Sequence, residues 1–130
     1  MSARLEEERK LLLTTFPQLE WAEDGMWGRI ADYIVPPTHW QEAVTAVAFR
    51  LPPGLPGEAP YAFFVRPCLT PMSPGMAITN FTESASTPFG DGWGQFSWAP
   101  EAWVPDAVIT SGSNMLNFVR SFAERLREGP

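Results

Sequence analysis

Apolar side chains recur at helical spacing near both ends of the chain. Residues 2–16 place theirs on one side of a helix, with Ser2 able to cap the first turn and Pro17 standing where the helix would end. Residues 113–128 give the clearest pattern, and Ser113 stands at the capping position. The apolar residues of this second pattern are Met115, Phe118, Val119, Phe122 and Leu126. The spacing predicts an N-terminal helix and an amphipathic C-terminal helix that packs on a sheet.

Four segments between these helices have the alternation, or the β-branched and aromatic content, of strands. They span residues 26–37, 42–51, 61–67 and 93–99. Residues 52–60 contain four prolines and two glycines, which predicts a rigid extended loop. Residues 68–92 are rich in proline, glycine and small hydroxyl side chains, so we expect a long loop with at most a few residues of strand, mobile until a partner binds. The pattern predicts one α+β domain over residues 1–130, with an antiparallel four-stranded meander between the helices.

Composition and charge argue against several classes of function. The net charge is −6, the isoelectric point is about 4.7 and the nine basic residues are scattered, which opposes binding to nucleic acid. Cys68 and His39 are the only residues of their types, so we expect no disulfide and no metal site. Gly90, Gly92 and Gly94 do not form a phosphate-binding loop, because no helix with a Lys-Ser or Lys-Thr step follows, and no cofactor is expected. No apolar run is long enough to span a membrane and no leader is evident, so we expect a cytoplasmic protein without a membrane partner.

The order of helix, antiparallel strands, long irregular segment and helix is the one found in the ubiquitin-conjugating-enzyme (UBC) fold. Residues 49–64, FRLPPGLPGEAPYAFF, resemble the tyrosine- and proline-rich stretch that this family carries between strands. The step Trp103-Val104-Pro105, followed by NMLNFVRSFAERL, is similar to the family's Trp-x-Pro step and the helix after it. The closer resemblance is to the divergent bacterial branch called prokaryotic UBC family E. It covers the chain from about Ile30 to Leu126 and implies a single UBC-like domain.

The resemblance also implies where a nucleophile would lie, a few residues before the Trp-x-Pro step, and there this chain has QFSW. Ser97 takes the place of the usual cysteine, while Cys68 directly follows the third strand and does not match that position. A serine would carry the C-terminus of a ubiquitin-like protein as an oxyester, and it needs a proton acceptor and donors to the oxyanion. The neighbours that could accept the proton are Asp91, Glu83, Glu101 and His39. We take Asp91 as the catalytic candidate; the family's His-Pro-Asn step is absent, and Asn80 is the nearby asparagine.

Further candidates concern binding. Trp98 would form a wall of the site beside Ser97, whereas for Trp93 burial is the simpler interpretation although it stays a candidate. The first helix of conjugating enzymes commonly docks the activating enzyme, which makes Arg9 and Lys10 candidates for that contact. The expected partners are therefore an activating (adenylating) enzyme and a ubiquitin-like protein. Two readings remain open besides an unrelated peptide-binding adaptor: a transferase that uses Ser97, and a catalytically silent relative that only binds these partners.

Overall fold

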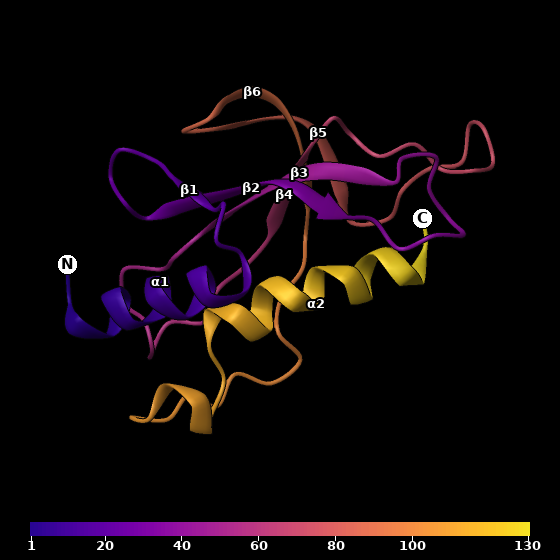
Figure 1. Ribbon diagram of the computed structural model, residues 1–130. Helices are drawn as coiled ribbons and strands as arrows, with labels where there is room; N and C mark the ends of the chain where they lie inside the picture. Colours follow the sequence, from indigo (N-terminus) through magenta and orange to yellow (C-terminus); the bar gives the residue numbers. More distant parts are fainter.

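The computed structural model describes residues 1–130 as an α+β fold in which two helices lie on the same side of an antiparallel sheet (Figure 1). The helices are α1 (Ala3–Thr15) and α2 (Met115–Glu128), and a single 3-10 turn, η1 (Ile109–Ser111), precedes α2. The strands are β1 (Glu20–Trp21), β2 (Trp27–Ile34), β3 (Val44–Arg50), β4 (Phe63–Arg66), β5 (Phe81–Thr87) and β6 (Gly90–Phe96). The N-terminal and C-terminal helices are confirmed within a residue or two of their predicted limits.

The sheet has six strands in the order β1-β2-β3-β4-β6-β5, so the predicted four-stranded meander is too small. The first four strands are consecutive neighbours, and the β5–β6 hairpin adds to the sheet through pairing of β6 with β4. Two strands were missed. Strand β1 is only two residues long, and β5 lies inside the segment 68–92 that we expected to be a loop. The sequence of β5, FTESAST, is largely polar because this edge strand is mostly exposed, so it carries no apolar alternation to detect.

The caps of the two helices differ in how well the sequence predicts them. Ser2 caps α1 as expected, its side chain accepting a hydrogen bond from the backbone of Leu5. For α2 the predicted cap is wrong by one residue: Asn114 is the N-cap, and its side-chain oxygen accepts from Asn117 N at 2.9 Å. Ser113 instead accepts a hydrogen bond from Val104 N through its hydroxyl, which fixes the segment that leads to α2.

An aromatic core joins α2 to the sheet. The ring of Phe63 stacks between those of Phe122 and Phe96, with centroids 4.2 Å and 4.9 Å away. The Tyr33 hydroxyl donates to the Val119 carbonyl, so β2 is also bonded to α2. These contacts place the last residues of β6 directly against α2. The residues that follow β6 in the chain therefore lie beside this helix. Neither helix has the length and apolar content that crossing a membrane requires.

Candidate functional site

Ser97 is the first residue after β6 and is exposed. Its backbone N–H donates to the carbonyl of Asn80 at 2.8 Å, which continues the β5–β6 pairing by one step beyond the strand ends. Asn80 has a φ of 53°, a left-handed conformation that asparagine adopts more readily than most residues. The fold thus brings together two of the predicted site residues, although they are far apart in the sequence.

Arg125 of α2 contacts the residues that precede Asn80 and Ser97. The residue is only 3% exposed, and its guanidinium donates to Thr79 O at 2.8 Å and to Gly129 O at 2.7 Å. It also lies over the ring of Phe96, 4.9 Å from the centroid, and forms no ion pair. Burial lowers the pKa of Arg125. One buried cation therefore holds the residue before Asn80 and packs on the residue before Ser97, and sequence reasoning gave it no role.

Trp98 lies next to Ser97 with a fixed ring. Its indole N–H donates to the Ser121 hydroxyl of α2 at 2.9 Å, and its carbonyl accepts from Ala62 N at 2.7 Å. The half-buried ring packs against the main core. Trp98 is therefore positioned beside the candidate nucleophile, and it also anchors the chain that leaves β6.

Asp91 and Trp93 lie elsewhere on β6. Asp91 precedes Ser97 by six residues of extended chain, a separation of roughly 20 Å, which is too far for proton transfer. Its carboxylate accepts a hydrogen bond from the Ser86 hydroxyl at 2.6 Å. Trp93 is fully buried in a small cluster with Ala48 and Phe64, apart from the main core. The structure brings neither residue to Ser97.

Cys68 lies in a setting that disfavours a thiolate. Burial, and next the negative charge of Glu83, raise the pKa of the Cys68 thiol. Both residues line a surface pocket of about 490 Å³, which Phe81, the first residue of β5, also lines. Nucleophilic cysteines need the opposite environment, one that lowers the thiol pKa. No group of three or more His, Cys, Asp or Glu side chains is placed to hold a metal ion.

The two basic candidates of α1 differ from each other. The Arg9 guanidinium stacks over Trp21, 4.4 Å from the ring centroid, so part of its role is packing. Lys10 is exposed and forms no ion pair, which leaves its charge available to a partner. Both residues line a small pocket at the surface of α1.

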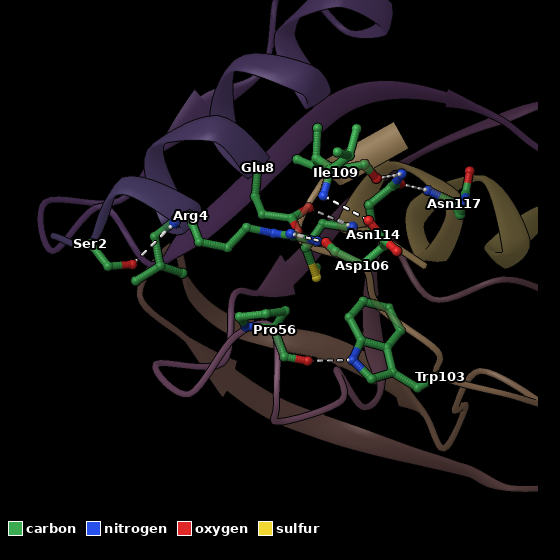
Figure 2. A network of polar contacts seen from close by, with 12 residues as sticks. Ser2, Arg4, Glu8, Pro56, Trp103, Asp106, Ile109, Asn114 and Asn117 are labelled. Carbon is green, nitrogen blue, oxygen red and sulfur yellow. Dashed lines mark hydrogen bonds and ion pairs between the residues drawn. The ribbon is translucent and has the colours of Figure 1, made fainter. Parts of the chain in front are cut away.

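A polar network fixes the Trp-x-Pro segment (Figure 2). The indole N–H of Trp103 donates to the Pro56 carbonyl at 2.7 Å, so this segment is bonded to the proline-rich loop between β3 and β4.

Glu8 of α1 is fully buried, and its carboxylate accepts from Met115 N at 2.8 Å and from Arg4 Nε at 2.9 Å. Sequence reasoning missed Glu8, although its spacing from the buried Leu5 and Leu12 of α1 was a usable signal.

Comparison with protein-family models, curated proteins and solved structures finds no match for this chain. The resemblance to the UBC family therefore stays a prediction from the sequence motifs.

Proposed function

We propose that this chain is a ubiquitin-conjugating-enzyme-like component of a bacterial ubiquitin-like conjugation pathway, and that Ser97 accepts the C-terminus of the ubiquitin-like protein from an activating enzyme. The observation that carries the proposal is the pairing of Ser97 with Asn80 at the end of the β5–β6 hairpin. The order of elements supports it as well. Helix α1 is followed by strands β1–β4, which are neighbours in chain order, then by the β5–β6 hairpin with Ser97 directly after it, and last by η1 and α2.

The proposed chemistry is acyl transfer to a hydroxyl. The oxygen of Ser97 attacks the activated C-terminal carbonyl carbon, the hydroxyl proton passes to a base, and the activating enzyme's leaving group departs. The resulting oxyester is later attacked by an amine, which forms an amide and restores the serine. In this mechanism the side-chain amide of Asn80 donates a hydrogen bond to the oxyanion. Arg125 keeps the backbone before Asn80 fixed, so that little reorganisation is needed during the reaction.

A second function, binding without catalysis, is favoured by one specific observation. The Ser97 hydroxyl has no hydrogen bond to a carboxylate or an imidazole, and Asp91 is engaged by Ser86. A serine without a neighbouring base is a weak nucleophile unless a partner supplies that base. A silent UBC-like adaptor would bind the ubiquitin-like protein or the activating enzyme through the same surface and form no adduct.

The type of covalent linkage separates these possibilities. The purified chain is incubated with ATP, a bacterial activating enzyme and the ubiquitin-like protein of that enzyme, and the products are resolved by denaturing electrophoresis. We expect an adduct that resists mild thiol reductant and is cleaved by hydroxylamine. Ser97→Ala should abolish the adduct, and Ser97→Cys should make it sensitive to reductant, because a thioester exchanges with thiols.

Cys68→Ala is the matched control and should leave the adduct unchanged. An adduct that disappears in reductant and depends on Cys68 would overturn the serine assignment. Stable binding of either partner with no adduct under any condition would replace the transferase by the silent adaptor.

A further inference from the structure

The largest groove on the molecule is not lined by any residue of the Ser97 site. It has a volume of about 660 Å³ and lies between the end of α1, the second half of β2 and the last turns of α2. Its apolar lining residues include Phe16, Leu19, Ile30, Tyr33 and Ala123. Ile34, which also lines it, is 75% exposed, an unusual degree for an isoleucine on a strand. An apolar groove of this size on the surface is typical of a binding site.

An open sheet edge runs along this groove. Strand β1 pairs only with Gly28 and Arg29 of β2, so residues 30–34 have no neighbouring strand on that side. The chain preceding β1 leaves the edge at a turn in which Leu19 N donates to the carbonyl of Phe16. No backbone hydrogen bond outside the regular elements involves residues 31–34. The groove therefore lies where a longer β1 would have paired with residues 30–34 of β2. The backbone N–H and C=O groups on that side of β2 have no partner strand.

The wall of the groove that α2 forms carries positive charge. Arg120, Ala123 and Arg127 of α2 are spaced so that they share one side of the helix. Arg120 donates to the hydroxyl of Thr15, which lines the groove, and Arg127 lines it directly. Both arginines are exposed and neither forms an ion pair, in a chain whose net charge is −6. An acidic group on a ligand would complement this wall.

We propose that the groove binds a short extended segment of a partner protein, which adds as a strand to the free edge of β2. Alternate apolar side chains of the segment fill the groove, and an acidic residue faces Arg127. Main-chain hydrogen bonds to a sheet edge combined with side-chain pockets are a recurrent mode of peptide recognition. The inference concerns a surface other than the Ser97 site and stands whether or not Ser97 is catalytic.

Two features of β2 define the occupant further. The pairing of β2 with β3 shifts register between Ile30 and Tyr33, and this irregularity limits the free edge to a few residues. Asp32 is exposed at that edge, so antiparallel pairing of two copies of the chain would bring like charges together. A short segment from another protein fits these constraints better than a second copy does.

The test uses the intact protein and a defined probe, an acetylated hexapeptide of alternating valine and threonine with one terminal glutamate. Two versions, with the glutamate at either end, cover both strand directions. Backbone amide shifts are followed by NMR during titration. We expect shifts concentrated in residues 31–34 and 120–127 and a gain of amide protection at the β2 edge. Methylating alternate backbone nitrogens should weaken binding at least about tenfold, because two main-chain hydrogen bonds are lost.

Charge is tested separately from the main chain. Arg127→Glu should weaken binding about fivefold or more, and a peptide with lysine in place of glutamate should recover part of that loss. The matched control is Arg50→Glu, an exposed arginine on β3 that does not line the groove and should leave binding unchanged. Equal binding of the methylated peptide, shifts centred elsewhere, or no shift at the solubility limit of either peptide would each overturn the proposal.

Discussion

Replacing Glu8 with alanine should destabilise the fold strongly, because Glu8 joins α1 to α2. The carboxylate is fully buried and satisfies two donors, the Met115 N–H at the start of α2 and the Arg4 guanidinium. The Arg4 side chain is itself only 11% exposed, so removing its partner leaves a poorly solvated positive charge. Breaking a buried pair in this way costs about 3–5 kcal/mol. The bond at the helix N-terminus is part of that sum, because negative charge there is favoured by the helix dipole.

The measurement is the free energy of unfolding from urea denaturation, monitored by tryptophan fluorescence. Glu8→Gln keeps one acceptor, for Met115 N, but replaces the oxygen that accepts from Arg4 Nε with an NH2 group, so it should cost about 1.5–3 kcal/mol. Glu7→Ala, at an exposed position on the same helix, is the control and should change stability by less than about 0.5 kcal/mol. A loss below about 1 kcal/mol for Glu8→Ala would refute the view that this carboxylate joins the two helices.

Three further predictions follow from the surroundings of particular groups. Burial raises the pKa of Tyr33 to about 12 from 10.0. The stability that the buried neutral phenol contributes is therefore present below pH 10 and is lost as the pH rises to 12, by about 2–3 kcal/mol. Tyr33→Phe should remove that part of the pH dependence of stability, and an unchanged profile would contradict the prediction. Cys68 should react with iodoacetamide more slowly in the native chain than in urea, because its pKa is raised; equal rates would refute this. Amides that pair β5 with β6 should exchange more slowly than those of the exposed residues 73–77, and equally fast exchange would indicate that the hairpin is not formed in solution.

The sequence predicts the elements whose side chains follow a regular period. α2 is correct along its length because one side of it is buried continuously against the sheet. Strands β2, β3 and β4 are recognisable from aromatic and β-branched residues that pack in the core. β5 is not, because it is an edge strand with mostly exposed polar residues, and its pairing with β6 decides its conformation.

The candidate site is predictable only in part. The motif that places Ser97 before the Trp-x-Pro step is local, so the sequence can show it. The approach of Asn80 to Ser97 depends on the register of the β5–β6 hairpin, which no local pattern specifies. Arg125 is a similar case, since on sequence grounds it belongs among the charged residues of an amphipathic helix. Its burial follows from tertiary structure, which brings the carbonyl of Thr79 to a guanidinium that also donates to the local carbonyl of Gly129.

The most direct test of the central proposal is to map the residue that carries the acyl group. The wild-type chain is charged with the ubiquitin-like protein, digested at low pH to preserve esters, and analysed by tandem mass spectrometry. We expect that the peptide containing Ser97 carries the C-terminal remnant of the ubiquitin-like protein and that the peptide containing Cys68 is unmodified. A remnant on any residue other than Ser97, or a chain that binds its partner and stays unmodified, would contradict it.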